Sequence, residues 1–284
     1  METAQEVYVN MKNSPPTAII GGYDPIAKSF FSALKAKNKK SIFINVANKK
    51  IKSENVYNFQ LFQLKKILDT LNNHKILDIL FLGKINRPNL SYFKKDGEID
   101  KYIPQLINSY MHGDGKILIS ILDIFTEKGF NLLPPNKVSE SFFFNKNELN
   151  DDFTKIDRKD KDKSIHILND LSKYDNAQSI VCINGYIVAI EAAEGTDNLL
   201  KRTAFIRQKL NQLENKAGLL TKIPKKNQSM LVDLPVIGLQ TLKLIKKSNL
   251  NGIAIDPKFT IIHNKKKFIE LAKQYDLKIY SVLN

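Results

Sequence analysis

Four carboxylates lie in or beside short loops within one stretch of the chain, residues 191–238, and each is close in sequence to a glycine or a proline. Acidic side chains grouped in such loops, at the ends of apolar strands, build a functional site more often than carboxylates spread along a helix do. Hard cations such as Mg²⁺ or Mn²⁺ bind carboxylates together with the phosphate oxygens of a substrate. The stretch therefore predicts a metal-and-phosphate site, whose candidate metal ligands are Glu191, Glu194, Asp197 and Asp233.

The loop after Glu191 joins the end of an apolar strand to a helix predicted over residues 198–214. Thr196 or Asp197 is a good N-cap for this helix. A helix N-terminus presents free N–H groups and partial positive charge, which bind phosphate. Gly195 and Thr196 are therefore the predicted substrate-binding residues of this loop.

Two cations and one acid near this loop are the predicted catalytic residues. Arg202, one turn into the helix, and Lys222 could stabilise phosphate charge, and Asp233 could bind the metal or orient a water. Carboxylates and a phosphate at one place repel each other unless a divalent cation lies between them, which is why we expect a metal. More ordinary roles remain open for two acids, because Asp197 could simply cap the helix and Glu194 could be a solvated loop residue.

Other common catalytic motifs are missing from the sequence. The four histidines show neither an H-E-x-x-H motif nor a Cys/His spacing typical of zinc. The chain contains no G-x-S-x-G nucleophile elbow and no Walker loop. The lone cysteine, Cys182, lies in the apolar segment SIVCI, which favours a buried strand residue over a reactive thiol.

The first part of the chain alternates apolar segments with segments of helical periodicity. Such alternation implies parallel strands joined by right-handed crossovers, which predicts a Rossmann-like sheet. Ligands in such sheets bind beyond the carboxyl ends of the strands. The expected strands cover 17–22, 41–47 and 76–83, and the expected helices 25–37, 60–73 and 114–128.

Glycines and cations stand at two of these strand ends. Gly21 and Gly22 end the first strand, but the dinucleotide fingerprint G-x-G-x-x-G is absent, so a tight turn explains them as well as a ligand does. Gly83 and Lys84 end the third strand, and Arg87 follows. A solvated loop explains these two cations about as well as a phosphate contact does. Gly21, Gly22, Lys84 and Arg87 are therefore candidate substrate-binding residues.

The composition becomes charged and poorly periodic after about residue 141, which indicates a domain boundary. We expect an N-terminal domain over 1–140, a charged linker region over 141–163 and a C-terminal α/β domain over 164–284. In the second domain, Asn184-Gly185 between two apolar runs predicts a β-hairpin. The helix that follows carries an apolar stripe predicted to be core, formed by Leu199, Ile206, Leu210 and Leu213.

The net charge of +15 comes almost entirely from lysine, because the chain has only four arginines. The lysines are spread over every predicted element and are not gathered with aromatics on one face, so we expect no nucleic-acid binding. The same charge would favour an anionic substrate or membrane surface. The longest apolar runs are shorter than the roughly 18 residues needed to span a membrane, and the first residues lack a secretory signal. These features predict a cytoplasmic protein.

The segment EAAEGTDNLLKR, followed by GLLTKIPKKNQSMLVDLPVIG, resembles the signature of the LpxI-type UDP-2,3-diacylglucosamine pyrophosphatases of lipid A synthesis in Gram-negative bacteria. The resemblance covers nearly the whole chain. GKINRP is similar to the family's Gly-Lys-x-x-Arg-Pro segment, and GDGKIL with EKGF to its Gly-Asp-Asp-x-Leu helix. The residues before the hairpin are similar to its Asp-Val-Gly-Gln segment.

The resemblance implies two α/β domains with the active site in the cleft between them, and a homodimer. It also implies Mg²⁺- or Mn²⁺-dependent hydrolysis, in which water attacks the α-phosphorus of UDP-2,3-diacylglucosamine. The products would be UMP and 2,3-diacylglucosamine 1-phosphate (lipid X). On this chain, Asp233 would be the essential acid. Because the substrate carries lipid chains, peripheral contact with the inner membrane is also expected.

The chain departs from the family pattern at three places. Ser229 stands where the family has an aspartate after glutamine. The N-terminal glycine loop matches only in part, and Asp256-Pro257 replaces a usual Glu-Ala-Gly. The loss of an acid at Ser229 keeps an alternative open, namely a non-catalytic nucleotide-sugar binding protein on the same fold.

Overall fold

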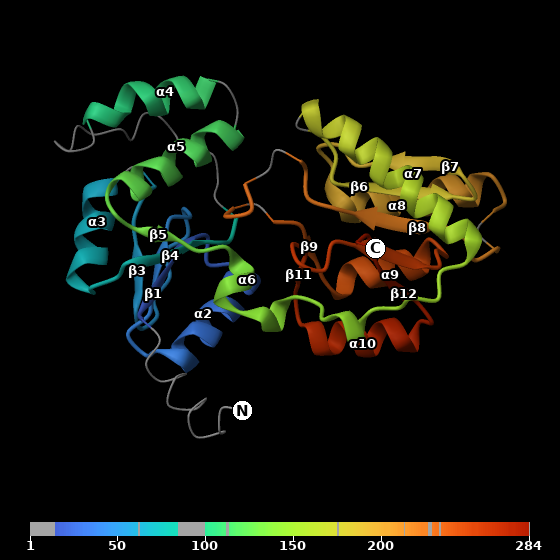
Figure 1. Ribbon diagram of the computed structural model, residues 1–284, viewed down its shortest axis with the longest axis horizontal. Coiled ribbons are helices and arrows are strands. Elements are labelled where there is room, and N and C mark those ends of the chain that lie inside the picture. The colour runs from blue at the N-terminus through green and yellow to red at the C-terminus, as the bar shows by residue number, and fades with distance from the viewer. Residues whose placement is uncertain are drawn as a thin grey trace. The chain divides into compact units, whose positions relative to one another are not determined.

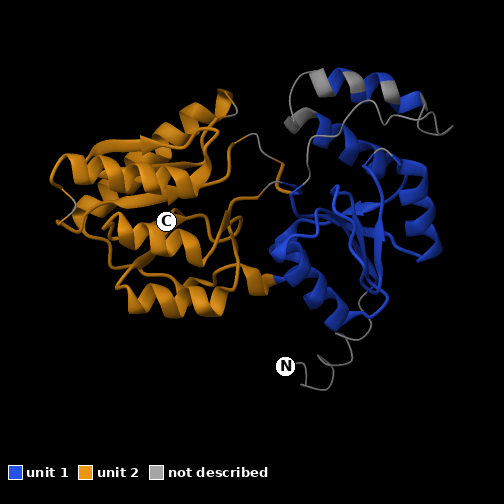
Figure 2. Ribbon diagram, turned by 180° about the vertical axis from the view of Figure 1, so that it is seen from behind, with its two compact units in different colours: residues 1–139, 231–233 blue, residues 140–230, 234–284 orange. Residues whose placement is uncertain are grey.

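The computed structural model describes residues 15–61, 63–84, 100–111, 114–174, 176–212, 214–226, 229–232 and 234–283. The chain forms two compact units (Figures 1 and 2). Unit 1 comprises residues 1–139 and 231–233, and unit 2 comprises residues 140–230 and 234–284. Each unit is built on its own five-stranded sheet.

The sheet of unit 1 has the strand order β3-β2-β1-β4-β5, and all of its neighbours are parallel. The chain leaves β1 to one side for β2 and β3, then returns to the other side for β4 and β5. The carboxyl ends of β1 and β4 are therefore adjacent where the winding direction changes, which is where open parallel sheets bind ligands. The strands are β1 (Thr17–Gly21), β2 (Ile42–Asn45), β3 (Val56–Asn58), β4 (Asp78–Phe81) and β5 (Asn131–Leu132).

The helices of unit 1 pack their apolar residues on this sheet. α2 (Pro25–Lys37) starts where predicted, because proline suits the first helical position and Asp24 caps the backbone N–H groups of Ile26 and Ala27. The sequence did not predict β3, α4 or α6, because the apolar patterns of these elements are short. The remaining helices are α3 (Leu64–Asn73), α4 (Ile103–Met111), α5 (Asp114–Glu127) and α6 (Pro135–Val138).

The sheet of unit 2 is mixed, with the order β12-β10-β8-β6-β7. β8, β10 and β12 are parallel, whereas β6 is antiparallel to both β7 and β8. The predicted hairpin is present, and Cys182 is fully buried in β6. The strands are β6 (Ser179–Ile183), β7 (Tyr186–Ile190), β8 (Leu219–Lys222), β10 (Gly252–Ile255) and β12 (Lys278–Ser281).

Helices cover this sheet, and one apolar prediction is wrong. Leu199 is buried, but Leu210 is 59% exposed because α8 ends before it, and Leu213 lies outside the described residues. The buried stripe of α8 contains Leu200, Ala204 and Arg207 instead. The helices are α7 (Lys155–Leu171), α8 (Gly195–Lys209), α9 (Leu239–Lys247) and α10 (Lys265–Gln274).

The charged residues 141–163 differ from the predicted linker, because they belong to unit 2 and contain the first half of α7. Three of their charged residues, Asp157, Asp160 and Lys161, are buried. Thr154 caps α7 by accepting from Asp157 N, and Asp160 is fully buried. The Asp160 carboxylate accepts from the backbone N–H groups of Asn184 and Gly185 at 2.9 and 2.6 Å, which holds the hairpin turn. The charged composition therefore belongs to an ordered part of unit 2, in which a few of the charges hold the fold together.

The segment before α9 contributes to both units. Leu231 and Val232 pack in the core of unit 1, whereas the short strand β9 (Val236–Ile237) pairs with β11 (Ile261–Ile262) in unit 2. In the part of the chain that the structure describes, no helix is long and apolar enough to cross a membrane.

Candidate functional site

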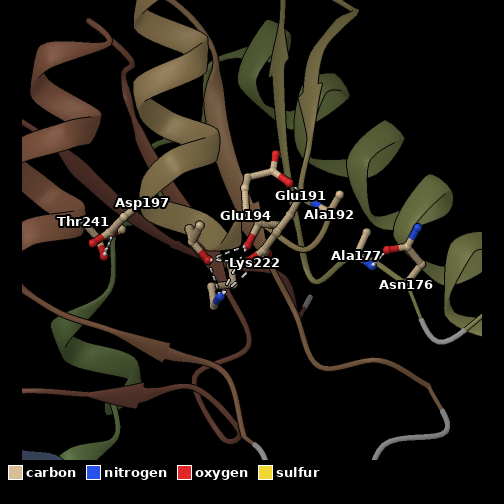
Figure 3. Close-up of polar contacts among 10 residues, drawn as sticks. Asn176, Ala177, Glu191, Ala192, Glu194, Asp197, Lys222 and Thr241 are labelled. Atoms are coloured by element: carbon tan, nitrogen blue, oxygen red, sulfur yellow. Dashed lines mark hydrogen bonds and ion pairs between the residues drawn. The ribbon is translucent and has the colours of Figure 1, made fainter. Parts of the chain in front are cut away.

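Four polar residues meet at one edge of the unit 2 sheet, and Figure 3 labels two of them, Glu191 and Lys222. Lys222 is the last residue of β8, and Ser179, the first residue of antiparallel β6, stands opposite it in the register. Glu191 directly follows β7, and its backbone N–H donates to Ser179 O at 2.9 Å. Thr196 belongs to the first turn of α8. We call Ser179, Glu191, Thr196 and Lys222 the sheet-edge cluster.

Thr196 Oγ1 is the centre of the sheet-edge cluster. It donates to Glu191 Oε1 at 2.9 Å and accepts from Lys222 Nζ at 2.6 Å. Ser179 Oγ lies 3.3 Å from Thr196 Oγ1 and 3.4 Å from Lys222 Nζ. The structure therefore brings together the predicted residues Glu191, Thr196 and Lys222, and adds Ser179. Sequence reasoning missed Ser179 because its position opposite Lys222 depends on the strand order.

Glu191 and Lys222 form a buried pair of opposite charges. Their side chains are 12% and 6% exposed, and Lys222 Nζ lies 3.9 Å from Glu191 Oε2. This distance is too long for a hydrogen bond. Among the described residues, Glu191 Oε2 has no hydrogen-bond partner although the atom is buried. A buried carboxylate oxygen of this kind is suited to accept a ligand.

Glu194 and Arg202 form a second pair, nearer to solvent. Arg202 Nη2 donates to Glu194 Oε1 at 2.6 Å and to Ile190 O at 2.8 Å, so it ties the loop to the end of β7. Ala192 N donates to the other carboxylate oxygen of Glu194. Backbone N–H donation and the Arg202 guanidinium lower the pKa of Glu194 below its ordinary value. Glu194 is therefore a charged group with protein partners on both oxygens.

Asp197 points away from this pair. Thr241 Oγ1, on α9, donates to Asp197 Oδ1 at 3.2 Å, and Figure 3 shows this contact apart from Lys222. The carboxylates of Glu191, Glu194 and Asp197 thus have three different partners. No group of three or more His, Cys, Asp or Glu residues able to hold a metal is found within the described ranges. The predicted metal ligand Asp233 lies outside those ranges.

The first residue of α8 requires glycine. Gly195 has a φ of +77°, a conformation that residues with a side chain rarely adopt. A Cβ at this position would meet no described atom within 4 Å, so the backbone angle and not crowding requires the glycine. The N-cap residue Glu194 makes no side-chain capping hydrogen bond to any N–H group of the helix within the described structure. The backbone N–H of Gly195 donates to Ala192 O at 3.4 Å, a long contact, and the N–H groups that follow in the first turn of α8 are the kind of donors that a phosphate uses.

One further acid stands at the same sheet edge. Ile255 is opposite Lys222 in the register of β10 and β8, and Asp256 follows it. Burial raises the pKa of the Asp256 carboxyl above its ordinary value, although the backbone N–H groups of Lys258 and Phe259 oppose the shift. A perturbed acid at a sheet edge is a common feature of functional sites. In the sequence, Asp256 is distinguished only by its departure from the family pattern.

The glycines of unit 1 have a packing role. A Cβ on Gly21 would lie 1.8 Å from Leu82 O, and one on Gly22 would lie 2.2 Å from Lys84 O. The loops after β1 and β4 therefore touch backbone to backbone. Asp24 Oδ2 accepts from Lys84 N at 3.0 Å, while its other oxygen caps α2. An acidic cap thus occupies the α2 N-terminus, and Arg87 lies outside the described residues.

The protein is thus an α/β protein of two units, with a polar cluster at the carboxyl edge of the second sheet. Models of the LpxI N-terminal domain and the LpxI C-terminal domain match residues 16–142 and 147–280. The chain therefore belongs to the LpxI family. A relative from Caulobacter vibrioides, named UDP-2,3-diacylglucosamine pyrophosphatase LpxI, is 28% identical over 206 residues. The matched region covers 72% of this chain and 74% of the relative.

Proposed function

We propose that this protein hydrolyses the pyrophosphate of UDP-2,3-diacylglucosamine in lipid A synthesis, giving UMP and 2,3-diacylglucosamine 1-phosphate (lipid X). The observation that carries the proposal is the match of both halves of the chain to the LpxI family, in which the Caulobacter relative bears the name of this activity. The sheet-edge cluster supports it, because a buried lysine beside a helix N-terminus suits a phosphorylated substrate.

The N-terminus of α8 is proposed to bind one phosphate through the backbone N–H groups of Gly195 and Thr196, with Gly195 giving up its long 3.4 Å contact to Ala192 O. Lys222 is the proposed cation that stabilises the charge developing on phosphorus, since its ammonium is held at the end of β8 in a largely buried position. Arg202 is proposed as a second cation, which also holds Glu194. Asp233 remains the proposed catalytic acid on the strength of the family resemblance.

A divalent cation, Mg²⁺ or Mn²⁺, fits the charge of this edge. Among Glu191, Glu194, Asp197, Arg202 and Lys222 the carboxylates outnumber the cations, so a pyrophosphate placed there would be repelled. The buried Oε2 atom of Glu191 suits one metal oxygen contact, and Asp233 is the proposed second ligand. Glu194 and Asp197, which already have protein partners, would orient the loop. When bound, the metal would neutralise phosphate charge and polarise the phosphorus.

Unit 1 is proposed to bind the part of the substrate that unit 2 does not bind. We propose that unit 1, an all-parallel sheet with the order β3-β2-β1-β4-β5, is Rossmann-like, and that Gly21, Gly22, Lys84 and Arg87 contact the remainder of the substrate. The active site would then lie in a cleft between the two units.

We propose a cytoplasmic homodimer that contacts the inner membrane peripherally through its lipid substrate, without binding nucleic acid.

The proposal is tested by incubating the purified protein with UDP-2,3-diacylglucosamine and Mg²⁺ or Mn²⁺. UMP and lipid X should be formed in equal amounts, and their formation should stop when a chelator is added. Asp233→Ala should abolish turnover while substrate binding persists. Tight substrate binding without release of UMP by the wild type would instead favour the non-catalytic nucleotide-sugar binding protein.

The position of attack is tested separately in ¹⁸O-labelled water. Attack at the α-phosphorus forms the new bond between the water oxygen and the uridine phosphate, and the bridging oxygen leaves with the sugar phosphate. The label should then appear in UMP. Label in lipid X would assign the attack to the β-phosphorus and would leave the overall reaction unchanged.

A further inference from the structure

The hydroxyl of Thr196 uses its full hydrogen-bonding capacity inside the protein. An ionised carboxylate only accepts and an ammonium only donates, so the directions of two bonds are fixed: Thr196 donates to Glu191 and accepts from Lys222. The single hydroxyl proton of Thr196 is then committed, which leaves its second lone pair to accept from Ser179. A hydroxyl with one proton and two lone pairs has no further bond to offer a substrate.

The same hydroxyl separates the two buried charges. Lys222 Nζ and Glu191 Oε2 stand 3.9 Å apart, whereas a direct ammonium–carboxylate hydrogen bond is about 2.8 Å long. Thr196 Oγ1 lies within hydrogen-bond distance of both side chains and bridges them. Without that bridge, Coulomb attraction in a largely buried setting would draw the ammonium onto the carboxylate. The buried Oε2 atom of Glu191 would then be occupied.

We infer that Thr196 is a positioning residue, whose hydroxyl holds Lys222 and Glu191 apart so that both act on the pyrophosphate. The inference rests on the proposed function. It assigns the side chain of Thr196 to the protein and leaves its backbone N–H, at the N-terminus of α8, as the contact for phosphate. Loss of the hydroxyl therefore impairs the chemical step more than substrate binding.

Thr196→Val keeps the shape of the side chain and the backbone N–H and removes the bridge. It should lower kcat by roughly 10- to 100-fold, the usual effect of losing a residue that orients a reacting group, and change KM by less than about threefold. Thr196→Ser restores the hydroxyl and should recover most of the lost kcat. Thr203→Val is the matched control, because Thr203 lies on the same helix and its buried hydroxyl donates to Leu199 O, outside the sheet-edge cluster.

A crystal structure of Thr196→Val gives a reading that is independent of activity, because the Lys222–Glu191 distance should shorten to a direct hydrogen bond. Ser179→Ala removes the weaker contact and should lower kcat by a smaller factor, which provides a second variant should Thr196→Val fail to fold. If the wild type is active and Thr196→Val has the kcat of Thr203→Val, the positioning role is refuted. A rise in KM at unchanged kcat would make Thr196 a substrate contact and also overturn the inference. A wild type that releases no UMP would overturn the proposed function and, with it, this role.

Discussion

Replacing Lys222 with methionine removes the cation that pairs with Glu191 and keeps an unbranched apolar stem. The two charges are 3.9 Å apart and mostly buried, which corresponds to an attraction of about 4 kcal/mol at an effective dielectric constant of about 20. The variant leaves the Glu191 carboxylate buried beside an apolar side chain. Breaking a buried pair in this way typically costs about 3–5 kcal/mol. We therefore expect Lys222→Met to destabilise unit 2 by about 3 kcal/mol or more.

A second substitution separates the charge effect from packing. Glu191→Gln in the Lys222→Met background removes the uncompensated charge and retains an acceptor for the Thr196 hydroxyl. The double variant should recover at least about 2 kcal/mol of the lost stability, as expected for residues that interact directly. Because a two-unit chain need not unfold in one step, hydrogen exchange of peptides covering β6 and β8 is the direct measure, supported by urea unfolding.

The double variant should regain stability without regaining activity. The double variant should remain inactive in UMP release, because it lacks both the cation and the carboxylate of the sheet-edge cluster. If Lys222→Met were as stable as the wild type, the pair would not be buried as described. If Glu191→Gln failed to restore stability in the Lys222→Met background, the cost would lie in packing, and the electrostatic reasoning would be refuted.

Two further predictions concern buried charges outside the sheet-edge cluster. Arg207 is 2% exposed and donates to several backbone carbonyls, including those of Ser248 and Asn249. Arg207→Met leaves these carbonyls without their donor and should destabilise unit 2 by about 4 kcal/mol or more in urea unfolding. A loss of stability below about 1 kcal/mol would contradict this. Burial raises the pKa of Asp256 above the ordinary value of 3.8. The folded chain therefore binds this proton more tightly than the unfolded chain does, and the charged carboxylate opposes folding at neutral pH. Asp256→Asn keeps the acceptor for Lys258 N and should therefore be more stable than the wild type at neutral pH. Unfolding measured at several pH values should show this gain in stability shrinking as the pH falls. A difference in stability that does not depend on pH would refute the raised pKa.

Local patterns were sufficient to predict most of the regular elements. The Asn184-Gly185 hairpin depends on residues adjacent in sequence, and Asn184 and Gly185 both adopt the positive φ that this turn needs. The position of Glu191 at the end of β7 follows from the same hairpin. The end of α8 was harder to predict. The helix ends at Lys209, and a local apolar pattern does not reveal whether the core packs against Leu210.

The candidate site was predictable only where its contacts are local. Thr196 and Glu191 are five residues apart and meet through the strand–loop–helix connection, whereas Ser179 and Lys222 meet because β8 pairs with β6. Strand order is a property of the whole sheet, and no spacing in the sequence fixes it. The Asp197–Thr241 contact likewise depends on how α9 packs beside α8.

Three carboxylates within seven residues of one another have acquired different partners, and the backbone explains why. Glu191 directly follows β7, so its side chain stays at the sheet edge with Lys222. Glu194 precedes the positive φ of Gly195 and reaches Arg202, on the exposed side of the helix. Asp197 lies one residue beyond Thr196 and turns by about 100° around α8, towards α9. The same loop therefore supplies one buried carboxylate with an oxygen left for a ligand and two carboxylates whose hydrogen bonds hold the shape of the loop.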